Sequence, residues 1–470
     1  MSGERDNSID EGCCALDERL KSKEMERDFM SEVSKTITIE QIYRRMEEID
    51  WDFKGADTLY LTHCYHSYPA RFIPQIPRTV IESFTNMKDV VLDPFCGCGT
   101  TLVESVLLDR KAVGIDINPI GALITKVKTT IIKPETLYEY YNSLIDPITS
   151  IIMQTRGEKT LTLEPIPKFK IPKMPKRKLS KKFTPEIKRE LACIKAKIME
   201  INDEDVRDFF MVALSSTIRT VVESRSKNID VLSIFLDDVK LMVRRMLEFY
   251  KACHKHYERP KIYCADSRKM WFIEDESIDL IVTSPSYVNA YDYNREHMFD
   301  IFWLHDYLCK KFKIDFKTFK KNELGAHSHY ICNRFLMVAE YFDGLYRCFQ
   351  HMNRVLKDGK TCCVVIGDST VEGEYIRTHE YFKEIAKELG FEVKADVLRN
   401  IDVDRKYLSK TIGKINQEHV LFFRKTRNNS ELGDPIQYVE NLLKRLLKSC
   451  KEKNKEKISN ALEEFRKIVG

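Results

Sequence analysis

The stretch "LDPFCGCGTT", residues 92–101, ends an apolar run with an acid and then places glycines and threonines close together. It lies between a predicted buried strand at 89–93 and a predicted helix at 101–108, and a second strand is predicted at 111–116. Glycine has no Cβ, so a turn that contains Gly97 and Gly99 lets a ligand approach the backbone closely. The stretch therefore predicts a β-α-β unit with a ligand at its first turn.

The second predicted strand ends on Asp116, in the region where nucleotide-cofactor folds carry an acid for ribose hydroxyls. A nicotinamide site would have a third glycine three residues after Gly99, but that position is Leu102. The turn therefore favours a nucleotide-type cofactor and argues against a dehydrogenase.

The rest of the chain alternates strands and helices around a long helical interruption. We predict a helix over 36–61 and another from 78 to 84, and a helical, basic segment from 134 to about 256. Four further parallel strands are predicted at 261–266, 278–287, 360–368 and 418–425. The expected fold class is α/β, a doubly wound and mostly parallel sheet with a helical basic insert. The predicted domains are a charged segment at 1–35, a cofactor-binding half at 36–133, the insert at 134–258, a catalytic half at 259–427 and C-terminal helices at 428–470.

Composition narrows the class of protein further. The 470 residues are 43% hydrophobic, which is enough for one large core or two smaller ones. None of the 14 cysteines stands as CxxC, and the single-residue gap between Cys96 and Cys98 does not suit a metal site, so no metal is predicted. The first 30 residues hold no signal-peptide pattern and no segment has membrane-spanning length. We expect a cytoplasmic protein.

Charge is concentrated in one place. The chain carries a net +5, but residues 165–198 hold twelve Lys and Arg against two Glu. Such an asymmetry is typical of a protein that presents one basic element to a polyanion. A solvated, proline-rich linker is the alternative interpretation. The candidate nucleic-acid contacts are Lys176, Arg177, Lys178, Lys181 and Lys182.

A second motif follows the apolar run "IDLIV". The sequence "TSPSY", residues 283–287, places a hydroxyl, backbone carbonyls and an aromatic ring at the end of this predicted strand. The carboxyl ends of parallel strands form the ligand-binding edge of an α/β sheet, so these groups should face the same site as the glycine turn.

Together the two motifs resemble those of the S-adenosylmethionine-dependent amino-methyltransferases, which modify exocyclic amines of bases. The cofactor motif D-P-F-x-G-x-G-T is met from Asp93 to Thr100, and the catalytic motif (S/D/N)-P-P-(Y/F/W) is met at 284–287 except for its second proline, which is Ser286. "HSYPARFIPQ", residues 66–75, resembles the N-terminal cofactor element of the cytosine-N4 branch. The resemblance covers about 62–130 and 260–425, and it implies a Rossmann-like class I methyltransferase fold.

The resemblance also implies roles for individual residues. Ser284 and the carbonyl of Pro285 would accept hydrogens from the target amine, and Tyr287 would stack on a base flipped out of the duplex. Serine at 284 is the usual mark of cytosine N4. The expected catalytic residues are Ser284, Pro285, Ser286 and Tyr287. The expected cofactor-binding residues are Tyr68, Pro69, Asp93, Pro94, Phe95, Gly97, Gly99, Thr100, Asp116, Ile117, Asp266 and Ser267.

The function predicted from the sequence is a site-specific DNA methyltransferase that acts on cytosine N4 and uses S-adenosylmethionine. Its expected partner is double-stranded DNA, contacted by the basic insert and by residues 305–332. Three alternatives stay open: an RNA base methyltransferase, a DNA adenine-N6 methyltransferase and a non-catalytic nucleic-acid-binding module. The sequence implies neither a recognition site nor a companion restriction endonuclease.

Overall fold

The computed structural model describes residues 38–158, 169–172, 181–226, 228–289, 292–314, 323–326, 333–401, 416–427 and 433–469. Its contacts divide the chain into two units, 1–49 and 50–470. The described part of the first unit is helix α2 (Ile39–Glu48), which begins at a capping box between Thr38 and Gln41.

The helix predicted over 36–61 is wrong beyond Glu48. The chain becomes extended at Ile49, and Phe53 and Gly55 take positive φ angles that no α-helix accommodates. A tertiary contact fixes this irregular path: the Asp52 carboxylate accepts a hydrogen bond from the backbone N–H of Asn400. Long-range pairing therefore overrides the apolar spacing that predicted a longer helix.

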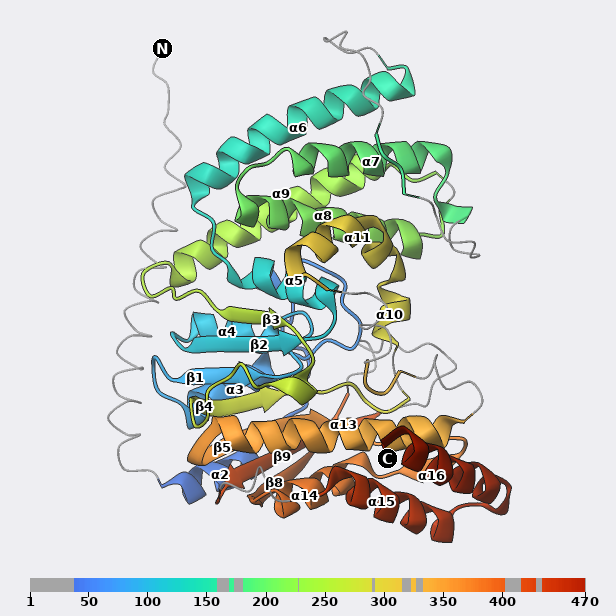
Figure 1. Ribbon diagram of the computed structural model, residues 1–470. Coiled ribbons are helices and arrows are strands. Elements are labelled where there is room, and N and C mark those ends of the chain that lie inside the picture. Colours follow the sequence, from blue (N-terminus) through green and yellow to red (C-terminus); the bar gives the residue numbers. More distant parts are fainter. Residues whose placement is uncertain are drawn as a thin grey trace. The chain divides into compact units, whose positions relative to one another are not determined.

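The main sheet has seven strands in the order β3-β2-β1-β4-β5-β9-β8 (Figure 1). The first five in this order pair in parallel, whereas β9 pairs antiparallel with both β5 and β8. The doubly wound, mostly parallel α/β sheet is confirmed. The strands are β1 (Val90–Asp93), β2 (Lys111–Asp116), β3 (Lys261–Cys264), β4 (Ile278–Thr283), β5 (Leu356–Ile366), β8 (Phe391–Asn400) and β9 (Gln417–Lys425); β6 (Ser369–Val371) and β7 (Glu374–Ile376) form a separate hairpin.

The expectation that residues 418–425 form a parallel strand is therefore wrong, and β8 was not predicted at all. Alternating exposure along β8 leaves few consecutive apolar residues to reveal it. An antiparallel strand next to β5 also needs no crossover helix, because β9 reverses direction relative to β5.

The helices of the C-terminal half pack against the sheet, and the buried side chains between them form one of two large apolar clusters. This cluster joins side chains of β4, β5 and β9 to those of the long helix α13 and of the tail helices. The tail contains helices α15 and α16 (Figure 1). The helices are α13 (Arg334–Val355), α14 (Thr378–Glu388), α15 (Pro435–Ser449) and α16 (Lys455–Val469).

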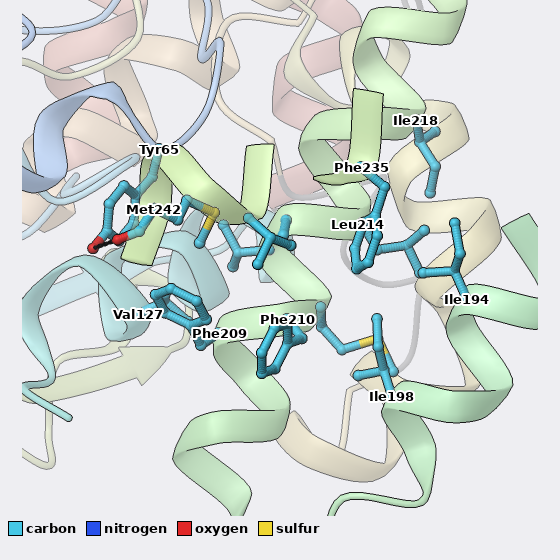
Figure 2. Close-up of a cluster of buried hydrophobic side chains, with 14 of the residues drawn as sticks. Tyr65, Val127, Ile194, Ile198, Phe209, Phe210, Leu214, Ile218, Phe235 and Met242 are labelled. Atoms are coloured by element: carbon cyan, nitrogen blue, oxygen red, sulfur yellow. Dashed lines mark hydrogen bonds between the residues drawn. The ribbon is translucent and has the colours of Figure 1, made fainter. Parts of the chain in front are cut away.

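The insert between β2 and β3 is helical, and its helices share a core with the cofactor half. Figure 2 shows Phe209, Phe210 and Phe235 of the insert in one buried cluster with Val127 of α5 and with Tyr65. Burying aromatic side chains is worth about 1.5–3 kcal/mol each, so this shared core fastens the insert to the sheet. The helices of the insert are α6 (Pro134–Arg156), α7 (Pro185–Met199), α8 (Glu204–Glu223) and α9 (Val231–Cys253). The other helices that precede α13 are α3 (Gln75–Phe84), α4 (Thr100–Leu107), α5 (Pro119–Thr129), α10 (Tyr293–Glu296) and α11 (Met298–Phe312).

The strand order places a topological switch point between β1 and β4. The chain runs outward from β1 to β2 and β3, and then returns to add β4 and β5 on the other side of β1. Ligands of open α/β sheets bind at this point, outside the carboxyl ends of the strands. The two strands that end there carry Asp93 and Thr283, so the glycine turn and the "TSPSY" motif meet at this edge.

Candidate functional site

A cavity that is partly open to solvent lies at the switch point. Eleven of the residues predicted from the sequence line it: Tyr68, Asp93, Phe95, Gly97, Thr100, Asp116, Ile117, Asp266, Ser267, Ser284 and Ser286. The structure thus brings the two motifs, about 190 residues apart in the sequence, to the walls of one cavity. The predicted residues that lie outside its lining are Pro69, Pro94, Gly99, Pro285 and Tyr287.

Asp93 ends β1 and is buried. Its Oδ1 atom accepts hydrogen bonds from the hydroxyl of Thr283 at 2.6 Å and from the backbone N–H of Phe95 at 3.0 Å. Burial nevertheless raises the pKa of Asp93 to about 6, because the charged form has lost its water. A cationic ligand in the cavity would stabilise this carboxylate.

Asp116 ends β2 and braces the glycine turn. One carboxylate oxygen accepts from the backbone N–H of Gly97 at 2.7 Å and the other from that of Asn118 at 2.8 Å. Burial raises the pKa of this side chain as well, to about 6. Each carboxylate oxygen has two lone pairs, so Asp116 can still accept a hydrogen bond from a hydroxyl of a ligand in the cavity.

The two glycines of the turn do different things. Gly97 has φ +50° and lines the cavity. Its carbonyl oxygen accepts a hydrogen bond from the Thr125 hydroxyl. Gly99 has φ +81° at the start of α4, and a Cβ there would stand 2.8 Å from the Thr125 side chain. Gly99 is therefore required by the contact between α4 and α5, a reason that the motif alone did not reveal.

Asp266 and Ser267 follow β3, the strand paired with β2, and line the cavity. Asp266 caps the short 3₁₀ helix Ser267–Lys269 and forms a 2.7 Å ion pair with Arg268. The hydroxyl of Ser267 donates to the carbonyl of Pro94 in the glycine turn. Ser267 therefore ties the end of β3 to the end of β1.

The catalytic-type turn is anchored in a way that compensates for its missing proline. The Ser286 hydroxyl donates to the carbonyl of Leu324 at 3.0 Å, while the Ser286 carbonyl accepts from the phenol of Tyr341 at 2.8 Å. Two tertiary hydrogen bonds therefore hold a position that a second proline would hold by fixing its own φ angle.

Tyr287 is partly buried, and its phenol donates a 2.7 Å hydrogen bond to Glu418 of β9. Burial raises the pKa of Tyr287 well above its usual value, and a hydrogen bond with the Ser284 side chain acts in the opposite direction. Of the three hydroxyl-bearing residues of the motif, Ser284 therefore acts on the phenol of Tyr287, whereas Ser286 bonds Leu324.

Nine lining residues were not among the predicted site residues, and Arg71, Tyr293 and Glu323 are three of them. Burial raises the pKa of Glu323 to about 8, although its carboxylate accepts from the backbone N–H groups of Tyr293 and Asn294. Arg71 stands in the "HSYPARF" element and could have been noticed there. Glu323 lies far from every motif, and no local pattern marks it.

Tyr68 connects the cavity to the insert. Its ring stacks on those of Tyr293 and His297, with centroids 5.7 and 4.8 Å apart. Behind it, the Ser215 hydroxyl of α8 lies 3.1 Å from the His66 ring and donates to Asp300 of α11 at 3.0 Å. Ser215 of the insert therefore bonds His66, which stands two residues before the cavity-lining Tyr68.

The predicted basic contacts divide into three groups. Lys176, Arg177 and Lys178 lie outside the described residues. Lys181 is exposed, as a phosphate contact requires. Lys182 instead donates to the carbonyls of Val222 and Ser224 at the end of α8, the latter at 2.9 Å. Lys182 therefore caps the C-terminal end of α8, where a cation is stabilised by the helix dipole.

Among the described residues, one group has the composition of a metal site: Asp368, His379 and His419, with ligand atoms within 4.8 Å of one another. Carboxylates already engage both rings, since His379 Nδ1 lies 2.7 Å from Asp368 and His419 Nδ1 lies 2.6 Å from Asp396. The two rings stack with centroids 3.7 Å apart. Hydrogen bonding therefore accounts for this group without an ion.

Comparison with known proteins agrees with the arrangement of the two motifs. A family model for N6/N4 DNA methylases matches residues 18–125 and 278–468, on both sides of the insert. In the described chain, no helix has the length and apolar character needed to cross a membrane.

Two relatives and one solved structure illustrate the likeness. The type II methyltransferase M.MvaI of Kocuria varians is 30% identical over 258 residues, which are 50% of this chain and 55% of that protein. M.MjaII of Methanocaldococcus jannaschii is 22% identical over 79% of this chain and 84% of its own length. A putative DNA modification methylase of Thermus thermophilus, complexed with S-adenosyl-L-methionine, aligns with 35% of this chain and 54% of its own, at 19% identity and a TM-score of 0.21. The chain spans about half the length of M.MvaI. Because the family model matches both halves of the sheet and most of the chain, the protein belongs to the N6/N4 methyltransferase family of DNA methylases.

Proposed function

We propose that this protein transfers a methyl group from S-adenosylmethionine to the exocyclic N4 amine of cytosine in double-stranded DNA. The observation that carries the proposal is the single cavity that Asp93 and Ser284 share at the switch point between β1 and β4. A cofactor at the first motif and a base at the second would meet within it.

S-adenosylmethionine is the cofactor of this family, and the cavity suits it. The cofactor carries a sulfonium, an ammonium and a ribose diol, and the cavity offers the carboxylates of Asp93, Asp116 and Asp266. Burial makes two of these carboxylates costly to ionise, and a nearby cation would reduce that cost. We assign Asp93 and Thr100 to the methionine end, Asp116 to the ribose and Asp266 with Ser267 to the adenine. Of the remaining predicted cofactor contacts, Tyr68, Phe95, Gly97 and Ile117 line the cavity, whereas Pro69, Pro94 and Gly99 lie outside its lining.

When bound, S-adenosylmethionine supplies an electrophilic methyl group. The amine of cytosine is a weak nucleophile because its lone pair is delocalised into the ring. Ser284 and the carbonyl of Pro285 would accept its hydrogens and so localise that pair, while Tyr287 stacks on the base. Preorganised acceptors at a fixed position would account for the catalysis, because the product can lose its proton after the transfer.

The choice of cytosine N4 over adenine N6 rests on Ser284, which stands where the motif also allows Asp or Asn. Ser286 replaces the second proline, and its hydrogen bond to Leu324 supports a turn that remains competent. We assign target recognition to the insert, because its Ser215 bonds His66, close to the cavity-lining Tyr68, whose ring stacks on His297.

Transfer of labelled methyl from S-adenosylmethionine to bacteriophage DNA, followed by nucleoside analysis, tests this function. We expect N4-methylcytosine as the labelled product. N6-methyladenine would identify the adenine branch, and label confined to RNA would identify an RNA enzyme. If the intact protein binds S-adenosylmethionine and DNA but transfers no methyl group, it is a nucleic-acid-binding module instead.

The basic segment is proposed to contact DNA phosphates through Lys176, Arg177, Lys178 and Lys181. Replacing all four with glutamine should weaken duplex binding and flatten its logarithmic salt dependence by about 0.9 for each phosphate that is no longer neutralised. Fluorescence anisotropy over a series of salt concentrations measures that slope.

The structure also alters the design of this test. Lys182 should be left intact, because its bonds to the end of α8 make any loss of binding ambiguous. A matched control neutralises four lysines of the C-terminal segment: Lys444, Lys448, Lys453 and Lys467. Equal salt slopes for the wild type and the basic-segment variant would leave the segment as a linker.

A further inference from the structure

Tyr287 sits in the middle of a chain of hydrogen bonds that starts in the cavity. Ser284 lines the cavity and stands in the same turn as Tyr287, and its side chain acts on the phenol as a hydrogen-bond partner that lowers the pKa of Tyr287. The phenol in turn donates to Oε1 of Glu418 at 2.7 Å, across 131 residues of sequence. A charged residue on the antiparallel strand β9 is therefore connected to the proposed catalytic serine.

Glu418 is itself held in place. Its second oxygen accepts from Arg399, its direct cross-strand partner on β8. The side chains of Glu418 and Arg399 are 15% and 6% exposed. Arg399 also donates from Nε to the carbonyl of Trp51 at 2.9 Å, and Trp51 is buried against Phe422 of β9 with ring centroids 5.7 Å apart. The carboxylate therefore has little freedom to rotate away from the phenol.

The ionised state of this pair fixes the direction of every proton in the chain. A carboxylate paired with arginine can only accept hydrogen bonds, so the Tyr287 O–H must point toward Glu418. The phenol oxygen then presents lone pairs to its other neighbour, and the Ser284 hydroxyl donates into them. Ser284 is left with its own lone pairs toward the cavity, where an amine hydrogen can be accepted.

We propose that Glu418 is a positioning residue for methyl transfer, acting through Tyr287 to keep Ser284 a hydrogen-bond acceptor toward the target amine. This inference rests on the proposed function, since it assigns Ser284 the role of acceptor. It adds a second task for Tyr287, which relays the direction of a hydrogen bond as well as offering a ring to the base. Arg399 secures the carboxylate in this arrangement.

The test compares Glu418→Gln, Tyr287→Phe and the double variant in single-turnover methyl transfer to bacteriophage DNA. An amide can donate as well as accept, so the side chain introduced by Glu418→Gln can reverse the chain and turn the serine proton toward the amine. Tyr287→Phe removes the relay but keeps the ring. Each single variant should slow transfer about 10- to 100-fold, the loss of one hydrogen bond to a charged group. The double variant should be no slower than the slower single variant, because both changes break the same chain.

Further measurements separate positioning from a merely structural role. Calorimetry should show an unchanged Kd for S-adenosylmethionine in all three variants, since Glu418 and Tyr287 lie outside the cavity lining. Glu392→Gln is the matched control: its side chain on β8 is 52% exposed and pairs with Lys394. Its transfer rate should match that of the wild type.

Two results would overturn the proposal. One is a full transfer rate in Tyr287→Phe, which leaves the hydroxyl without a task; this variant loses a single oxygen atom and gives a result even if Glu418→Gln fails to fold. The other is a double variant whose loss is the product of the two single losses, which means that the residues act independently. Absence of transfer by the wild type would instead refute the proposed function, so the two failures are distinguishable.

Discussion

Ser284→Ala is expected to lower the rate of methyl transfer by about 10²–10³ while leaving cofactor affinity unchanged. Removing one preorganised polar contact to the reacting group costs this much in enzymes whose catalysis rests on such contacts. The hydroxyl lines the cavity at the carboxyl end of β4, and the residue before it, Thr283, is tied to Asp93 at 2.6 Å. The backbone should therefore keep its position when the side-chain oxygen is removed.

Single-turnover transfer and calorimetric titration with S-adenosylmethionine measure the two quantities separately. Ser277→Ala is the matched control, because Ser277 is a serine just before β4 that bonds the carbonyl of Glu274 and lies outside the cavity lining. A wild-type rate in Ser284→Ala would remove the serine from the mechanism, and a raised cofactor Kd would place it in the cofactor site.

Asp93→Ala is expected to raise the Kd for S-adenosylmethionine by at least about 30-fold. Losing one partner of a buried, hydrogen-bonded charge pair costs about 2–5 kcal/mol of binding free energy. Stability should fall too, because the Thr283 hydroxyl and the N–H of Phe95 lose their shared acceptor. Asp93→Asn keeps an acceptor oxygen of similar shape, so its thermal transition should lie closer to that of the wild type while its affinity remains weak.

The pH dependence of binding provides an independent check on Asp93. Burial raises the pKa of both Asp93 and Asp116 to about 6, so protons occupy these carboxylates below that pH in the free protein. A cationic cofactor favours the ionised forms, so its affinity should fall as the pH drops through about 6. Asp93→Asn removes one of the two titrating groups and should show a shallower dependence. Asp89→Asn, just before β1, should retain the wild-type dependence. A slope for Asp93→Asn equal to that of the wild type would exclude Asp93 from contact with the charged cofactor.

Local patterns in the sequence were enough for the β-α-β unit of β1, α4 and β2 and for eleven of the residues that line the cavity. An apolar run, two glycines and an acid at the tip of the next strand are features of neighbouring residues, and their geometry follows from backbone sterics. The shared edge of the two motifs also followed, because parallel strands joined by crossovers expose their carboxyl ends on one side of the sheet, whereas the switch point came only with the strand order. Asp93, Asp116 and Ser284 were accordingly expected at one edge of the sheet, and all three line the same cavity.

Features set by contacts between distant segments could not be predicted in this way. The antiparallel direction of β9 depends on its pairing with β5 and β8. The bond of Tyr287 to Glu418 follows from that pairing, and the carboxylate of Glu323 accepts hydrogen bonds from residues 29 and 30 positions earlier in the chain. Lys182 looks like one more cation of a basic run, yet the fold gives it the end of α8 as its partner. Such contacts have no local signature, because the free energy that selects them comes from burial and hydrogen bonds formed only when separate elements pack together.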